Sequence, residues 1–121
     1  MRFILVSDSE AQTSSCSLNV NVGSMKDPKE FPGLAHLVEH MLQSGSKKFP
    51  KEDHFQDFVK SKSGQKKSDT GEDYTNFLFE IDCRDFRSAL EIFSSYFKEP
   101  LFTPSQAGKC MKIVDDEFQA T

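Results

Sequence analysis

The sequence predicts an α+β fold in which a mainly antiparallel sheet packs against helices. Two stretches alternate apolar and polar side chains, as half-buried strands do: residues 15–22 and residues 75–81. Residues 83–98 instead carry apolar side chains at helical spacing. With 121 residues, the chain is long enough for one domain with its own core. We therefore interpret residues 1–121 as a single domain.

Helix starts are marked further along the chain. Asp82 is a suitable N-cap for the helix over 83–98. The last helix begins with a capping-box pattern, in which Thr103 is the N-cap, Pro104 takes the first helical position and Gln106 follows. Pro50 predicts the start of another short helix, whose apolar face is formed by Phe55, Phe58 and Val59.

The N-terminal region predicts one more strand. Residues 2–6, RFILV, form a continuous apolar run, and we expect a short buried strand here that pairs antiparallel with residues 15–22. A polar turn over 7–14 separates the two segments. Residues 23–32 contain one glycine and two prolines, which predicts a loop.

Composition excludes several function classes. The net charge is −4 with no long basic run, so nucleic acid is not an expected partner. No apolar run approaches the 18 residues of a membrane span, and MRFILV is too short for a signal-peptide core. Three cysteines without metal-type spacing indicate a reducing setting, so we expect a cytoplasmic protein.

The most informative stretch is residues 33–45, GLAHLVEHMLQSG. In a helix, His36 and His40 lie one turn apart, so both imidazoles project from one face and can bind a single zinc ion. Glu39 lies beside that face, where a carboxylate can act as a general base. The order His-x-x-Glu-His is the inverzincin pattern. The alternative is a helix with two half-exposed histidines and a solvated glutamate, which needs no metal.

The flanks of this motif favour a packed helix. Pro32 and Gly33 interrupt the preceding chain, and Gly45 is a suitable helix stop. The apolar residues within the segment predict a buried stripe formed by Leu34, Leu37, Val38, Met41 and Leu42. Two imidazoles and a carboxylate on so apolar a helix are costly unless they are paired or bound, which favours the metal site.

The sequence resembles the insulinase (insulysin- and pitrilysin-like) family of zinc metallopeptidases over nearly its whole length. The resemblance is strongest over 17–58, which includes the motif and its approach VGSMKDP (22–28). It continues through GEDYTNFLFEI (71–81), PLF (100–102) and VDDE (114–117). By this resemblance the chain is the N-terminal part of the first domain of a longer peptidase, and the fold is a partial insulinase-family domain.

The resemblance also implies site residues and chemistry. His36, His40 and Glu117 would be the ligands of one Zn²⁺ per chain, and Glu39 would be the general base of a metalloendopeptidase that hydrolyses unfolded peptides. The residues alone do not select Glu117, since Asp115 and Asp116 are chemically equal candidates. Family members are built from two halves that close around a peptide substrate. We therefore expect the remainder of a parent chain, its C-terminal half, as a partner, and little activity from this chain alone.

Two positions depart from the family pattern. Cys110 stands where the family commonly has a second glutamate that supports the metal site. Residues 60–70 are polar and basic, so they fit a solvated loop, yet they align with the edge strand that pairs with substrate backbone in the family. There Lys67 and Ser68, after Lys66, are the candidate substrate-binding residues, and they suggest a preference for acidic peptides.

These departures leave other functions open. A non-catalytic insulinase-family subunit, serving in binding or assembly, is the main alternative, and the changes at Cys110 and in the edge strand favour it. The intact His36, Glu39 and His40 argue against it. A third possibility is an unrelated small α+β interaction domain in which the motif occurs by chance.

Overall fold

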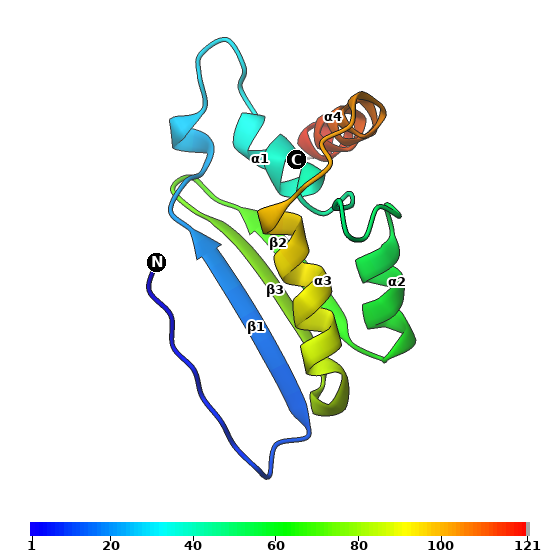
Figure 1. Cartoon of the computed structure of the whole chain (residues 1–121). Helices are drawn as coiled ribbons and strands as arrows, with labels where there is room; N and C mark the ends of the chain where they lie inside the picture. Colours follow the sequence, from blue (N-terminus) through cyan, green and yellow to red (C-terminus); the bar gives the residue numbers. More distant parts are fainter. Residues whose placement is uncertain (121) are drawn as a thin grey trace.

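The computed structural model describes residues 1–120 and shows a three-stranded antiparallel sheet with helices on one of its faces (Figure 1). The strands are β1 (Thr13–Val20), β2 (Gln65–Thr70) and β3 (Thr75–Asp82), and their order in the sheet is β1-β3-β2. The α-helices are α1 (Leu34–Met41), α2 (His54–Ser61), α3 (Phe86–Lys98) and α4 (Pro104–Gln119). Two short 3-10 helices cover Ser24–Lys26 and Cys83–Asp85. The predicted α+β class is confirmed.

Strand β3 is the centre of the sheet and the source of its apolar face. Its side chains alternate as predicted, because Phe77, Phe79 and Ile81 are buried while their neighbours are more exposed. Strand β1 pairs with β3 along one side and β2 along the other, so both β1 and β2 are edge strands.

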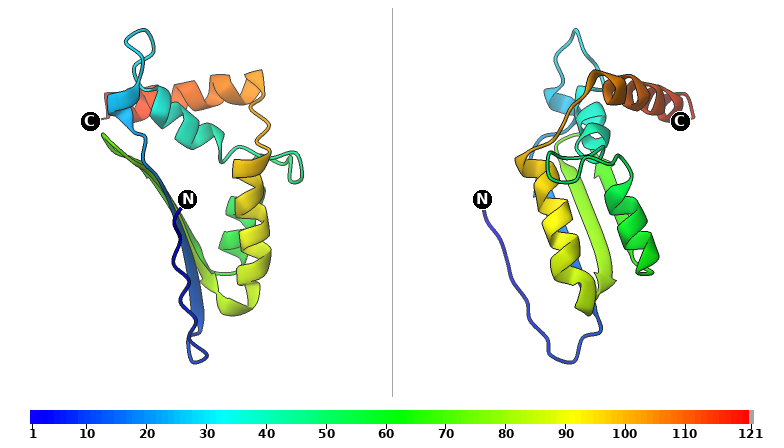
Figure 2. Two further views of the ribbon diagram at one scale, coloured as in Figure 1. Left: turned by 60° about the vertical axis from the view of Figure 1, so that its left-hand side comes forward. Right: turned by 45° about the vertical axis from the view of Figure 1, so that its right-hand side comes forward.

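Helices α2 and α3 pack on this apolar face, as the turned views show (Figure 2). The core is aromatic: the ring of Phe55 meets those of Phe79 and Tyr96 edge-on, with centroids 5.5 and 5.9 Å apart. The Tyr96 hydroxyl accepts a hydrogen bond from the Phe55 backbone N–H (3.2 Å), and burial raises the pKa of that phenol. The helical apolar pattern over 83–98 therefore indicated the core correctly.

Helices α1 and α4 lie against each other across one end of the sheet (Figure 2). The start of α4 is as predicted: the Thr103 hydroxyl accepts from the Gln106 backbone N–H, Gln106 bonds back to Thr103, and Pro104 occupies the first turn. The predicted cap at Asp82 is also present, although it caps the 3-10 helix that precedes α3.

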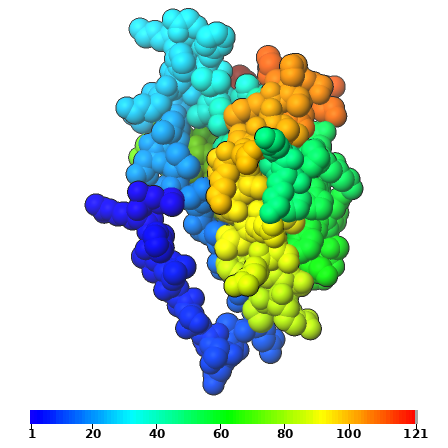
Figure 3. All heavy atoms as spheres, viewed as in Figure 1, coloured from blue at the N-terminus to red at the C-terminus, as the bar shows by residue number. Residues whose placement is uncertain are grey.

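The prediction of a buried strand over residues 2–6 is wrong. Phe3 and Val6 are 76% and 88% exposed, and β1 pairs with β3 instead of with this segment. Figure 3 shows the N-terminal residues extending away from the rest of the surface. An apolar run predicts burial only when another element covers it, and no element within residues 1–120 covers this one.

Several elements also differ in their bounds from expectation. Strand β1 covers Thr13–Val20 instead of 15–22, and α3 begins at Phe86 instead of 83, after a 3-10 helix. Helix α2 begins at His54, four residues after Pro50, because turns occupy the intervening residues. Helix α1 ends at Met41, and a turn precedes Gly45. Residues 65–70, within the polar stretch for which a solvated loop was one interpretation, form the edge strand β2. No helix among the described residues is both long and apolar enough to cross a membrane.

Candidate metal centre

Helix α1 presents the two motif histidines side by side, and α4 brings Glu117 to them. One carboxylate oxygen of Glu117 (Oε2) lies 2.6 Å from His36 Nε2 and 3.2 Å from His40 Nε2. The two imidazole centroids are 5.1 Å apart. Both rings are partly exposed, so the cluster lies at the surface of the α1 and α4 pair and is open to solvent.

These three residues have the donor set of a zinc site. Their candidate ligand atoms, two imidazole nitrogens and one carboxylate oxygen, all lie within 4.8 Å of one another. Catalytic zinc sites use three protein ligands of these kinds and leave a fourth position for water or substrate. The residues present therefore fit zinc. Of the three acidic candidates at the end of α4, the structure brings Glu117 to the histidines.

The start of α1 is held by a residue that the sequence analysis did not single out. Gly33 precedes the helix with φ at 91°, a conformation that glycine adopts without strain, and it has no side chain with which to cap the helix. Asp27 does this instead: its two carboxylate oxygens accept from the backbone N–H groups of Gly33 (2.8 Å) and Ala35 (2.9 Å). A carboxylate at this end also interacts favourably with the helix dipole. The only sequence signal was its place in the segment VGSMKDP.

The loop before α1 is attached to the turn between β2 and β3. Ser24 and Met25 donate backbone hydrogen bonds to the carbonyls of Gly71 (3.0 Å) and Glu72 (2.8 Å). Gly23 makes this approach possible, because a Cβ at this position would lie 2.3 Å from the Gly71 carbonyl oxygen. The loop thereby fixes where α1 begins relative to the sheet.

The Glu39 side chain points toward β2. Its side chain is 4% exposed, and it is the only buried residue of α1. Both carboxylate oxygens accept hydroxyl hydrogen bonds, Oε2 from Ser68 (2.7 Å) and Oε1 from Thr70 (2.6 Å). A buried carboxylate with both oxygens bonded satisfies the requirement that buried polar groups have partners.

The predicted apolar stripe of α1 is therefore wrong in part. Leu34 and Val38 are exposed, at 39% and 38%, whereas Leu37, Met41 and Leu42 are partly buried. The helix turns its most polar residue toward the sheet because β2 supplies two hydroxyl donors there. Leu34 and Leu37 line an apolar hollow between α1 and α4, whose other walls include Met111 and Val114.

Cys110 lies outside the three-residue cluster. It is buried between α4 and the turn after α1, with its sulfur 3.4 Å from the Ser44 hydroxyl oxygen. That hydroxyl donates to the backbone carbonyl of His40 (3.0 Å). The thiol thus contacts the backbone of the histidine helix through Ser44.

The two lysines of β2 face opposite ways. Lys67 is exposed on the outer face of the sheet, whereas Lys66 is partly buried on the face that carries α1. The Lys66 ammonium donates to the side-chain oxygen of Gln43 (3.1 Å). Burial lowers the pKa of Lys66, and the nearby carboxylates of Asp53 and Glu39 oppose that shift. The Ser68 side chain also faces inward, where it bonds to Glu39.

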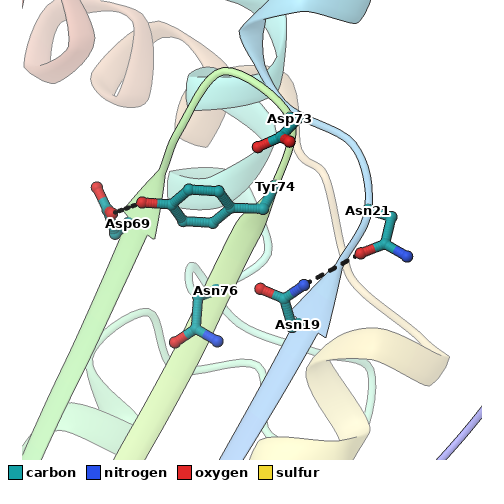
Figure 4. A pocket seen from close by; sticks show the side chains of 6 residues that line it. All are labelled: Asn19, Asn21, Asp69, Asp73, Tyr74 and Asn76. Carbon is teal, nitrogen blue, oxygen red and sulfur yellow. Dashed lines mark hydrogen bonds between the residues drawn. The ribbon is translucent and has the colours of Figure 1, made fainter.

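A second polar cluster lies on the opposite face of the sheet (Figure 4). Tyr74 donates its hydroxyl hydrogen bond to Asp69 (2.7 Å), and the amide of Asn19 donates to Asn21 (3.2 Å). Hydrogen bonding to Asp69 raises the pKa of Tyr74. These two bonds lie within the open hollow, whereas Asn76, which also lines it, donates to Ser17.

Comparison with known proteins gives consistent matches along nearly the whole chain. The family model described as "Insulinase (Peptidase family M16)" matches residues 2–121. An insulin-degrading enzyme homolog from Dictyostelium discoideum is 38% identical over 117 residues, which cover 97% of this chain and 12% of that protein. Mouse (Mus musculus) insulin-degrading enzyme is 34% identical over 119 residues, covering 98% of this chain and 12% of that enzyme.

Solved structures share the same fold. The crystal structure of pitrilysin superposes with a TM-score of 0.88 at 33% identity, covering 93% of this chain and 12% of that one. A protease from Helicobacter pylori superposes with a TM-score of 0.81 at 20% identity, covering 88% of this chain and 26% of that one, a likeness of fold. The chain thus spans about one eighth of the length of the curated relatives described above.

Proposed function

This chain belongs to the insulinase family of peptidases, and we propose that it carries the zinc ligands and the general base of a metalloendopeptidase. The observation that carries the proposal is the convergence of His36 and His40 on α1 with Glu117 on α4. Helix α1 also carries Glu39, which is buried and bonded at both carboxylate oxygens. Family membership supports peptide-bond hydrolysis as the reaction.

The proposed roles follow from donor chemistry. The Nε2 atoms of His36 and His40 and a carboxylate oxygen of Glu117 would hold one Zn²⁺. Zinc, when bound, acts as a Lewis acid and lowers the pKa of its water toward about 7. Glu39 accepts a proton from the attacking water and returns it to the leaving amine, as a general base and then a general acid.

We further propose that a peptide substrate binds in extended form along β2. This strand lies at the edge of the sheet, and strand addition at such an edge uses backbone hydrogen bonds. Lys67 is exposed and free to contact a bound peptide, whereas Ser68 would contribute through its backbone, since its side chain bonds to Glu39. The basic character of this strand supports a preference for acidic segments of unfolded peptides.

The length comparison supports a longer parent. The matched region makes up about 12% of each of these relatives, so they are much longer than this chain. We propose that this chain is the N-terminal part of such a peptidase. Its activity then needs the C-terminal half of the parent, and the isolated chain has little or none. A cytoplasmic location remains part of this proposal.

The first test is the zinc-to-protein ratio after incubation with zinc and removal of the excess. We expect about one zinc per chain, and near zero in His40→Ala and Glu117→Gln, because three ligands are needed for a tight site. His54→Ala is the matched control, since His54 stacks on Phe49 outside the cluster and its loss leaves the ratio unchanged. A ratio near zero in the unmodified protein would contradict the proposed site.

The second test is peptide hydrolysis by the full-length protein. Glu39→Gln should retain zinc and lose about 100-fold or more in kcat, the usual effect of removing a general base. Zinc binding without Glu39-dependent hydrolysis would favour the non-catalytic family subunit. That alternative draws on Cys110, whose thiol lies at Ser44 and cannot supply a carboxylate's charge.

A further inference from the structure

A chain of hydrogen bonds leads from Lys66 to the carboxylate of Glu39. The Lys66 ammonium donates to the Gln43 side-chain oxygen (3.1 Å), and the Gln43 amide nitrogen donates to the Ser68 hydroxyl oxygen (3.0 Å). The Ser68 hydroxyl then donates to Glu39 Oε2 (2.7 Å). These residues come from β2 and from the turn after α1, so the chain joins the sheet to the helix that carries the motif.

The direction of hydrogen-bond donation along this series is determined by the two neighbours of the Gln43 amide. An ammonium has only donors, so the atom of Gln43 that faces Lys66 must be the amide oxygen. A backbone carbonyl is only an acceptor, so the atom of Gln43 that faces the Glu39 carbonyl (2.8 Å) must be the amide nitrogen. The two neighbours require the same orientation of the amide, which therefore does not depend on an arbitrary choice between its oxygen and nitrogen.

This orientation determines what the Ser68 hydroxyl does. The hydroxyl has one proton, and its oxygen already accepts from Gln43. Its proton is therefore directed to Glu39, while Thr70 donates to the other oxygen of the same carboxylate. The carboxylate is held at both oxygens by donors on β2, which fixes the plane of the group as well as its position.

We infer, on the basis of the proposed function, that Ser68 and Gln43 are positioning residues for the general base Glu39. A base that is already held in one orientation loses no further rotational freedom when the reaction begins. The entropic cost of the reaction is then smaller, which contributes to the rate. The half-buried Lys66 supports the inference. Burial lowers the pKa of its ammonium, which means that burial disfavours the charged form. The ammonium is nevertheless kept here in a hydrogen bond to the neutral amide of Gln43.

The series of hydrogen bonds is tested directly by NMR on the metal-free protein. Both side-chain amide protons of Gln43 have acceptors, so we expect both to exchange with solvent at least tenfold more slowly than those of Gln56, which is exposed. In Ser68→Ala, the proton that faced Ser68 should lose its protection, and the proton facing the Glu39 carbonyl should keep it. Ser17→Ala, on the outer face of the sheet, is the matched control.

The positioning role is tested by kinetics on the full-length protein. Ser68→Ala should lower kcat about tenfold, the size of effect that removal of an outer hydrogen-bond partner has at such sites, with KM and zinc content unchanged. Ser68→Thr restores a hydroxyl and should recover most of the loss. A purely structural role would lower thermal stability in Ser68→Ala and leave kcat per folded molecule as it was.

The outcomes separate this inference from the proposed function. Fast exchange of both Gln43 amide protons in an active peptidase would overturn the inference alone, as would an unchanged kcat in Ser68→Ala. A full-length protein that binds no zinc and hydrolyses no peptide would overturn the proposed function, and with it the positioning role. Protected Gln43 protons would then still establish the hydrogen-bond chain itself.

Discussion

Helices α1 and α3 are both amphipathic, but they bury opposite kinds of side chain. Helix α3 buries an apolar stripe against β3, which includes Ala89, Ile92 and Phe93. Helix α1 buries Glu39 and leaves Leu34 and Val38 exposed. The difference lies in what the sheet offers each helix: α3 meets the aromatic centre of the sheet, whereas α1 meets the hydroxyl-bearing edge strand β2.

The two helices contribute differently to the molecule. The stability of the fold comes from α3 and its contacts, because a large apolar area is removed from water there. Helix α1 contributes a charged group and two histidines, whose burial and clustering cost free energy unless they are bonded. We therefore expect substitutions in the two regions to affect different measurements.

Phe79→Ala should have the largest effect on stability. Phe79 is fully buried, and its ring contacts those of Phe55, Phe86 and Phe93. Truncating such a side chain leaves a cavity and costs about 3–5 kcal/mol. Urea unfolding monitored by circular dichroism measures this, with the exposed Phe3→Ala as the control that should change little. A cost below about 1 kcal/mol would mean that β3 and α3 do not form the core.

The core was predictable because its signals are local. The alternation over 75–81 and the helical spacing over 83–98 arise from neighbouring residues, and so does the capping box at Thr103. The same reasoning failed for residues 2–6, since an apolar run does not say which element covers it. It also failed for the buried face of α1, because Ser68 and Thr70 lie 29 and 31 residues from Glu39 in the sequence.

The candidate site was predictable only in part. The spacing of His36 and His40 places them on one helix face whatever the rest of the chain does. Glu117 was chosen by resemblance, since 77 residues separate it from His40 and only the packing of α4 on α1 brings them together. Asp27 was missed because its role depends on how a loop folds back onto the start of α1.

Asp27→Ala should have the next largest effect, and it bears on α1 alone. The substitution removes both acceptors from the N-H groups of Gly33 and Ala35, and loss of a helix cap costs about 0.5–2 kcal/mol. Because His36 lies in the first turn, we also expect weaker zinc binding. Thermal unfolding and a zinc titration measure the two effects.

Thr103→Ala is the matched comparison for Asp27→Ala, since it removes the cap of α4 at the end of that helix far from Glu117. It should cost a similar amount of stability and leave zinc affinity closer to that of the unmodified protein. Equal losses of zinc affinity in the two variants would mean that Asp27 stabilises the fold generally, without a particular effect on the histidine helix.

Glu39→Gln should have the smallest effect on stability, although Glu39 is nearly as buried as Phe79. The amide removes a buried charge, which is favourable, and weakens two charge-assisted hydrogen bonds, which is unfavourable. One hydroxyl, from Ser68 or Thr70, can still donate to the amide oxygen while the other accepts from its nitrogen. We expect a change within about 1 kcal/mol in urea unfolding of the metal-free chain, because these terms offset each other.

Glu39→Ala provides the contrast, since it leaves both hydroxyls without their acceptor and should cost more, about 1–3 kcal/mol. A loss above about 2 kcal/mol in Glu39→Gln itself would mean that the charge, and not merely its hydrogen bonds, holds α1 on β2. The packing of helix α1 would then depend on its carboxylate as that of α3 depends on its apolar stripe. Glu39 would in that case have a structural role in addition to its role as a base.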